Sequence, residues 1–377
     1  MKSIYLDNAA TTAVAPEVFE AMIPFFKDHY GNPSSTHHLG RKTKAVIETS
    51  RRTISKALNC LPSEIYFTSG GTEADNLAMH AAVRDLGCQH IITSTIEHSA
   101  IIKTAELLRD QGHIQLHWVQ LTDNGHIDLE HLESLLRANK NTYVTLMHGN
   151  NEIANLLPLE KVSELCQQYG AIFHSDTVQT MGHYSFDLQK ISISMLNAAA
   201  HKFHGPKGTG FIYVNRNLKI QPDITGGGQE RGMRGGTENI AGIVGLAKAV
   251  ELAYAELQEH AAHISTMKQH MKKGLQSLFP NIQFNGDSAS EDSLYTVLNV
   301  NFPAHENADM FLFLLDLNGI CASGGSACSS GATKGSHVLT AINALRAGQA
   351  SVRFSFGRYT SKQEIDEALS IIKNLMQ

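Results

Sequence analysis

The sequence predicts an α/β fold in which a large domain with a mostly parallel sheet is followed by a smaller α+β domain. Short β-rich runs alternate with helical stretches through much of the chain, which is typical of βαβ crossovers. The order of elements changes after a long helical region near 238–278. A length of 377 residues also exceeds what a single core usually supports.

The alternating region begins with EIYFT at 64–68 and continues to GFIYV at 210–214. Such β-branched and aromatic runs favour strands. Strands are expected at 64–68, 90–94, 114–119, 142–147, 171–175, 191–196 and 210–214. Helices are expected at 73–86, near 99–110, from about 128 and after Pro158.

The smaller domain is predicted from the elements that follow the long helical region. They are a strand at 294–302, a helix at 306–318, a Gly/Ser-rich loop, a strand at 351–356 and a helix from Gln363. Chain termini often lie close together, so the N-terminal segment is expected to pack beside this domain. We therefore predict a large domain at 14–257 and a small domain made of 1–13 and 258–377.

Composition argues against several classes of protein. The formal charge of −5 provides no basic surface for nucleic acid. No apolar segment is long and uncharged enough to suggest a membrane span, and MKSIYLDNAATT has no apolar signal core. Five cysteines without a CxxC pair fit a reducing compartment and no thiolate metal site. We expect a soluble, cytoplasmic protein with no membrane, nucleic-acid or metal partner.

Polar groups follow several of the predicted parallel strands. SGGT at 69–72 offers close backbone approach and a helix start for an anion, Asp176 ends one strand, and Lys202 lies in AAAHKFHGPKGTG after another. Ligands bind where parallel strands end. Pyridoxal phosphate needs both an acid and a lysine, so the set indicates that cofactor. A solvated loop position for Lys202 is the competing interpretation.

Two further residues stand out near the C-terminus. Cys328 lies in SGGSACSSG, where few side chains could bury it, and this indicates an accessible thiol. Arg353 alternates with apolar residues in SVRFSF. It could face solvent or point into a cleft and bind a carboxylate.

Taken together, motifs spread over nearly the whole chain resemble those of the cysteine desulfurases, which are pyridoxal-phosphate enzymes of the class V aminotransferase group and fold type I. The setting of the cysteine in SSG resembles the branch that serves iron–sulfur cluster assembly. The motifs are YLDNAATT (5–12), NPSSTHHLGR (32–41), SGGTEADN (69–76), EHSA (97–100), NNEIA (150–154), AHKFHGPKG (200–208), GGGQERGMRGGTEN (226–239), SGGSACSSG (323–331) and VRFSFGR (352–358).

The resemblance implies roles for the residues around the cofactor ring. Lys202 would form the Schiff base, Asp176 would pair with the ring nitrogen, and His98 would stack on the ring and shuttle protons. Gln179 would bind the phenolic oxygen. Asn151 would lie near that oxygen and the substrate carboxylate.

Other implied roles concern phosphate, substrate and partners. Gly71, Thr72 and His201 would bind the phosphate, and Thr237 would reach the phosphate of the other subunit of a homodimer. Arg353 would clamp the carboxylate of L-cysteine. Cys328 would take the sulfur as a persulfide, release L-alanine and pass the sulfur to an iron–sulfur scaffold protein or another acceptor, including one used for thiolation.

One position departs from the resemblance, and alternatives stay open. Ala199 stands where the family commonly has a serine whose hydroxyl holds the phosphate, so the cofactor could bind less tightly. The alternatives are an aminotransferase or selenocysteine lyase of the same fold, or a non-catalytic sulfur-carrier scaffold. A metal site at His201 and His204 is a weaker alternative, because HxxH without further donors is a poor ligand set.

Overall fold

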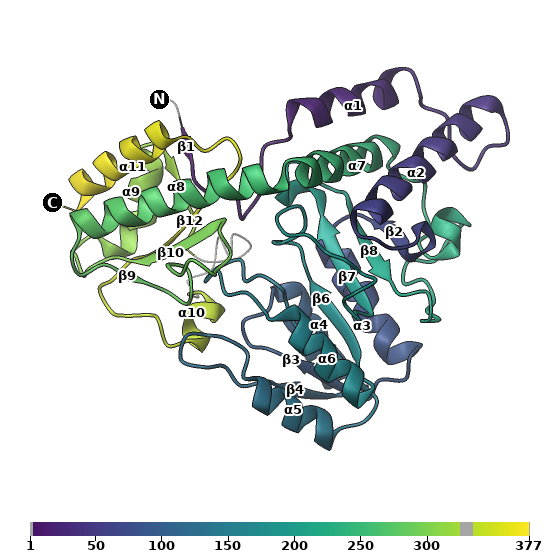
Figure 1. The fold of residues 1–377 in the computed structure, drawn as a ribbon, viewed down its shortest axis with the longest axis horizontal. Coiled ribbons are helices and arrows are strands. Elements are labelled where there is room, and N and C mark those ends of the chain that lie inside the picture. Colours follow the sequence, from purple (N-terminus) through teal and green to yellow (C-terminus); the bar gives the residue numbers. More distant parts are fainter. Residues whose placement is uncertain (1–2, 325–334, 377) are drawn as a thin grey trace.

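The computed structural model describes residues 3–324 and 335–376, which form two groups of elements (Figure 1). One group surrounds a seven-stranded sheet, here called the large sheet. The other surrounds a three-stranded sheet, here called the small sheet. Helices α7 (Ile240–Ala255) and α8 (Leu257–Leu278) follow one another and lead from the first group to the second (Figure 1).

The large sheet has the strand order β2-β8-β7-β6-β5-β3-β4. Only β8 runs antiparallel to its neighbours, so the sheet is mostly parallel, as predicted. The carboxyl ends of β2, β3, β5, β6 and β7 therefore meet at one edge. The strands are β2 (Ile65–Thr68), β3 (His90–Thr93), β4 (Gln115–Trp118), β5 (Thr142–Thr145), β6 (Ile172–Asp176), β7 (Met195–Ala199) and β8 (Gly210–Val214).

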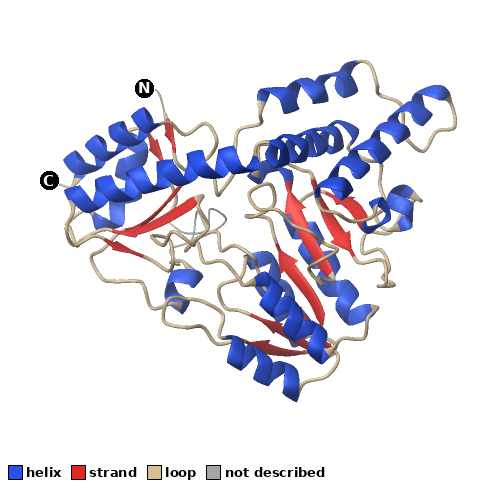
Figure 2. Cartoon of the chain, viewed as in Figure 1, coloured by secondary structure: helices blue, strands red, loops and turns tan. Residues whose placement is uncertain are grey.

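Helices cover both faces of the large sheet (Figure 2). Residues of α3 and α4 share one core with Ile91 and Tyr143. Residues of the other five helices share a second core with Ile92 and Val144. Successive strand residues thus point into different cores, which explains the continuous apolar runs. The helices are α1 (Pro16–Lys27), α2 (His38–Ala57), α3 (Gly71–Arg84), α4 (Ser99–Asp110), α5 (Leu129–Ala138), α6 (Leu159–Tyr169) and α7.

The small sheet is antiparallel, with the order β12-β10-β9. Ile4 and Leu6 belong to the same core as α8, and β1 pairs with β11 in parallel, so the N-terminal segment packs there as expected. The boundaries 14–257 and 258–377 stay a prediction. The elements are β1 (Ile4–Tyr5), β9 (Gln283–Phe284), β10 (Val297–Asn301), β11 (Ile320–Cys321), β12 (Ser351–Ser355), α9 (Phe311–Leu317), α10 (His337–Ala341) and α11 (Lys362–Leu375).

Four short 3₁₀ turns complete the described chain: η1 (Pro62–Glu64), η2 (Ala200–Lys202), η3 (Gln229–Gly232) and η4 (Ala308–Met310). Helices α1 and α2 have no counterpart among the predicted elements, because they precede the strand–helix alternation. Within the described ranges, none of the helices is both long enough and apolar enough to cross a membrane.

The strand before Lys202 begins later than predicted. Its predicted range was 191–196, whereas β7 spans Met195–Ala199. The N–H groups of Ile191 and Ile193 form local turn hydrogen bonds to Asp187 O and Ile191 O instead. Alanine disfavours strands by propensity, but pairing with β6 and β8 and complete burial override that preference. The predicted strand therefore begins four residues too early and ends three residues too early.

Candidate functional site

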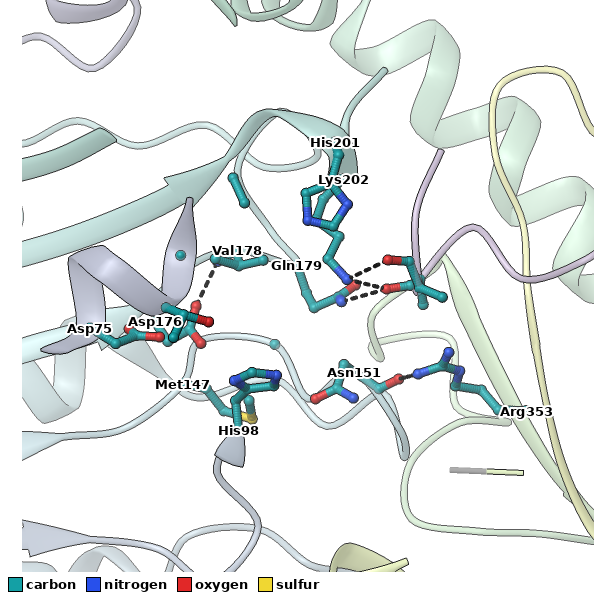
Figure 3. A pocket seen from close by; sticks show the side chains of 16 residues that line it. Asp75, His98, Met147, Asn151, Asp176, Val178, Gln179, His201, Lys202 and Arg353 are labelled. Atoms are coloured by element: carbon teal, nitrogen blue, oxygen red, sulfur yellow. Dashed lines mark hydrogen bonds between the residues drawn. The ribbon is translucent and has the colours of Figure 1, made fainter. Parts of the chain in front are cut away.

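A cavity of about 190 Å³ lies at the edge where the parallel strands end (Figure 3). Its lining joins the large sheet to the small sheet and to the N-terminal segment. The expected residues that line it are Gly71, Thr72, His98, Asn151, Asp176, Gln179, His201, Lys202 and Arg353. Among these expected residues, Gly71 and Arg353 are 282 positions apart in the chain, yet both line the same cavity.

Lys202 ends the turn η2, three residues beyond the last residue of β7. Its Nζ atom donates hydrogen bonds to Ala9 O at 2.5 Å and Ala10 O at 3.0 Å. Gln179 also reaches the N-terminal segment, donating from Nε2 to Ala9 O at 3.0 Å. The amine is thus held inside the cavity by backbone carbonyls, and the solvated-loop interpretation of Lys202 is wrong.

Asp176 is the last residue of β6, and its side chain is buried. Its Oδ1 atom accepts a hydrogen bond from Val178 N at 2.9 Å. Burial raises the pKa of Asp176, while His98 and Lys202 act to lower it. A buried carboxyl in this setting favours a nearby positive partner.

His98 caps the start of α4, where its Nδ1 atom accepts a hydrogen bond from Ala100 N at 3.2 Å. Burial lowers the pKa of His98, and Asp176 only partly offsets that effect. The ring is therefore neutral at physiological pH, with its proton on Nε2. In Figure 3 the ring lies between Asp176 and Asn151.

The start of α3 forms another part of the cavity lining. Gly71 and Thr72 are its first two residues, where N–H groups lack partners within the helix. A β-carbon at Gly71 would lie 2.7 Å from Val178 Cγ2, so only glycine fits without movement. Ala199 lies on this part of the lining and offers no hydroxyl. The helix start is suited to an anion such as a phosphate.

His201 and Arg353 complete the polar lining. Burial lowers the pKa of His201 to about 4, and its Nδ1 atom lies 3.2 Å from Thr11 Oγ1. Arg353 is buried, which excludes a position facing solvent. It donates from Nη1 to Asn151 O at 2.9 Å and from Nη2 to Asp7 Oδ1 at 2.8 Å.

One expected residue that the structure describes lies elsewhere. Thr237 lines a second cavity, whose lining also includes Ser69 and Arg234. Cys328 lies outside the described residues.

Sequence reasoning missed several contributors to the cavity, among them Asp75, Ala9 and Ala10. Asp75 follows Thr72 by three positions in α3, a spacing that places both on one face of the helix. Ala9 and Ala10 contribute carbonyls from YLDNAATT. The spacing could have identified Asp75, whereas no side-chain chemistry distinguishes the alanines.

The lining fits pyridoxal phosphate. Asp176 can face a ring nitrogen, Lys202 supplies the amine, and the start of α3 supplies N–H donors for a phosphate. The neutral ring of His98 offers a flat face beside Asp176. Each feature that this cofactor requires is thus present in one cavity.

Comparisons with known proteins agree with this geometry. Residues 4–368 match the family described as aminotransferase class-V. The whole chain is 38% identical over 380 aligned residues to a protein named cysteine desulfurase IscS from Dictyoglomus turgidum, of which it covers 95%. A solved structure titled NIFS-like protein is 35% identical, with a TM-score of 0.91 and 99% of each chain covered.

A second solved structure is titled "SspA in complex with cysteine". It is 32% identical, with a TM-score of 0.81, and the comparison covers 95% of this chain and 99% of that one. The chain therefore belongs to the aminotransferase class-V family of pyridoxal-phosphate enzymes and, within it, to the cysteine desulfurases.

Proposed function

We propose that this protein converts L-cysteine to L-alanine and transfers the sulfur, as an enzyme persulfide, to an acceptor for iron–sulfur cluster assembly or thiolation. The observation that carries the proposal is the convergence of Lys202, Asp176 and Arg353 on one cavity. Relatives named cysteine desulfurase and a neighbour titled as a cysteine complex support the choice of substrate.

Pyridoxal phosphate, when bound, supplies a ring that withdraws electrons from the amino acid attached to it. Lys202 anchors the cofactor and moves protons at its Nζ atom. Asp176 holds a proton on the ring nitrogen by charge, and Gln179 and Asn151 bind the phenolic side. Gly71, Thr72 and His201 hold the phosphate.

His98 and Arg353 act on the substrate side of the cofactor. The neutral His98 ring would stack on the bound cofactor, and it would exchange a proton at Nε2, because Nδ1 already accepts from Ala100 N. Arg353 binds the substrate carboxylate through its guanidinium, which Asn151 O and Asp7 orient. Asn151 thus contributes to substrate binding as well.

Cys328 takes the sulfur. Its thiolate forms an S–S bond to the substrate sulfur while the bond between that sulfur and the β-carbon breaks. The electron pair of the broken bond remains with the carbon, which then takes a proton to complete alanine. A glycine- and serine-rich neighbourhood suits a thiol that receives sulfur in one place and delivers it in another.

We further propose a cytoplasmic homodimer in which Thr237 serves the phosphate of the other subunit. Thr237 lines the same cavity as Ser69, which precedes Thr72 by three positions, and this supports that role. The acceptor would be an iron–sulfur scaffold protein or another sulfur carrier.

The test compares the holoenzyme with Lys202→Ala and Lys207→Ala. Lys207 is an exposed lysine five positions away, so it serves as the matched control. Alanine and sulfide released from L-cysteine in the presence of a thiol are measured. We expect loss of both products in Lys202→Ala and normal release in Lys207→Ala.

A Cys328→Ser variant separates the alternatives. Normal alanine release from L-cysteine in this variant would favour a selenocysteine lyase, whereas conversion of L-cysteine to a 2-oxo acid by amino-group transfer would favour an aminotransferase. A wild-type protein that binds no cofactor at all would instead support a sulfur-carrier scaffold.

A further inference from the structure

Two buried carboxyl groups from different elements meet in the cavity. Asp75 of α3 is 1% exposed and Asp176 of β6 is 6% exposed, and both line the cavity. Figure 3 shows the two side chains next to each other. When two carboxyl groups are buried and adjacent, the negative charge of one opposes the ionisation of the other.

Asn197 fixes the position of Asp75. It pairs with Asp176 across β6 and β7, and its Oδ1 atom accepts a hydrogen bond from Thr177 N at 3.1 Å. A backbone N–H can only donate, so the amide orientation of Asn197 is determined. Its Nδ2 atom therefore donates to Asp75 Oδ1, at 2.7 Å. One oxygen of Asp75 is thus committed as an acceptor.

The groups around the pair add little positive charge. His174 Nε2 lies 3.8 Å from Asp75 Oδ1, but burial lowers the pKa of His174 to about 3, so its ring is neutral. Burial raises the pKa of Tyr143, so the phenol is neutral as well. Glu97 is a third buried carboxyl, which binds Met147 N at 2.9 Å and Ser94 Oγ at 2.9 Å.

Two basic side chains lie near the pair, and both affect the ionisation of Asp176. His98 and Lys202 both favour the ionised form of Asp176. Of the two, His98 is itself neutral because burial lowers its pKa. The pair is therefore surrounded by one lysine and by neutral or acidic groups.

We propose that Asp75 is a positioning residue that holds a proton beside Asp176, so that the pair presents a single negative charge, on Asp176, to the ring nitrogen of the cofactor. The inference rests on the proposed function, since it assigns that nitrogen to Asp176. Burial, reinforced by Asp176 and Glu97, raises the pKa of Asp75, in agreement with the geometry.

The proposal has a consequence for pH dependence. At alkaline pH Asp75 loses its proton, and a second negative charge then stands beside Asp176. That charge favours protonation of the ring nitrogen and of His98. Asp75→Asn keeps an acceptor for Asn197 and a donor toward Asp176, so it mimics the protonated acid and cannot undergo this change.

The test is infrared spectroscopy of the holoenzyme, which detects the carbonyl stretch of protonated carboxylic acids. Asp75→Asn is compared with Glu97→Gln, the matched control that removes the other buried acid. At neutral pH we expect wild type to contain a protonated aspartic acid, identified by ¹³C-aspartate labelling. Asp75→Asn should lose this band and Glu97→Gln should keep it. Persistence of the band in Asp75→Asn, or its absence from wild type, overturns the proposal.

The second measurement is the pH dependence of the cofactor's visible absorption. A residue that only supports the fold would leave the profile of the folded holoenzyme unchanged, and that outcome would also contradict the proposal. We expect an alkaline transition in wild type and Glu97→Gln that Asp75→Asn lacks. If Asp75→Asn does not fold, the labelled wild-type protein still shows whether a protonated aspartic acid is present, and its absence would overturn the proposal. The infrared band does not depend on desulfuration, so a protein with the band but no alanine release would refute the proposed function alone.

Discussion

Two buried groups of charged residues in this protein differ in how completely they are paired. In the first, Arg51 of α2 binds Glu230 of η3 through two hydrogen bonds, at 2.7 and 2.8 Å, and both side chains are buried. Arg51 also donates to Ile65 O and Glu230 accepts from Phe67 N. At the cavity, by contrast, Asp75 and Asp176 line the wall, and Glu97 is buried close to Asp75. Of the two cations in the lining, Arg353 is already bound to Asp7, so these three acids outnumber Lys202.

The difference separates a structural ion pair from a binding site. A buried pair whose remaining hydrogen-bonding atoms are satisfied serves the fold, although it adds little net stability. An excess of buried acid is unfavourable without a positive partner, and such perturbed groups cluster at functional sites. The buried acids of the cavity therefore lower stability but favour ligand binding, whereas the Arg51–Glu230 pair serves the fold.

Breaking the Arg51–Glu230 pair should produce the largest loss of stability. Arg51→Met leaves Glu230 buried without its cation, so we expect a loss of about 3–5 kcal/mol in the free energy of unfolding. Chemical denaturation measures this loss. Arg52→Met is the control, because Arg52 is exposed and should cost little. The double variant Arg51→Met/Glu230→Leu should recover most of the loss, and a double variant as unstable as the single one would contradict the explanation.

Removing a buried acid from the site should change how stability depends on pH. Burial raises the pKa of Glu97 to about 8, from an ordinary value of 4.5. Between these values the native state holds a proton that the unfolded state has lost. Stability therefore falls as pH rises, by up to about 1.4 kcal/mol per pH unit.

The variant Glu97→Gln should lose that decline, whereas Glu160→Gln, at an exposed position of α6, should keep it. The measurement is the free energy of unfolding of wild type and both variants at several pH values from 4.5 to 8. Parallel curves for wild type and Glu97→Gln would mean that Glu97 is already ionised in the native state.

Asp176→Asn should separate binding from folding. Loss of a charged partner for the ring nitrogen should weaken cofactor binding by about 1.5–3 kcal/mol, roughly 10- to 100-fold. The same variant should leave the cofactor-free protein at least as stable as wild type, because it removes a buried charge. Cofactor titration and denaturation of the apoprotein give the two values. A marked destabilisation of the apoprotein would place Asp176 with the structural pair.

Ala199→Ser should have the smallest effect. The added hydroxyl lies on the cavity lining near the start of α3 and can donate to a phosphate, so we expect about tenfold tighter cofactor binding. Ala198→Ser is the control, since residue 198 points into the core on the opposite side of β7. It should destabilise the protein by about 1–3 kcal/mol without a gain in affinity. Equal cofactor affinities for Ala199→Ser and wild type would show that another group already replaces the hydroxyl.

Much of the large sheet could be predicted from the sequence because its signals are local. The strand–helix alternation identified β2 to β6 and β8 within a few residues. Because parallel strands end at one edge, it also predicted that Asp176 and Lys202 would meet. The strand β7 was misplaced because alanines carry a weak strand signal, and only pairing with β6 and β8 makes them a strand.

The sequence by itself determined the parallel α/β architecture and the residue types at the ends of its strands, since hydrophobic periodicity and turn residues act over a few positions. Tertiary structure alone decided that Arg353 faces the cavity rather than solvent, that Arg51 pairs with Glu230, and that Asp75 lies beside Asp176. These pairings join residues far apart in the chain. Whether a charge is buried, paired or left in excess depends on which segments pack together, and no local pattern encodes that.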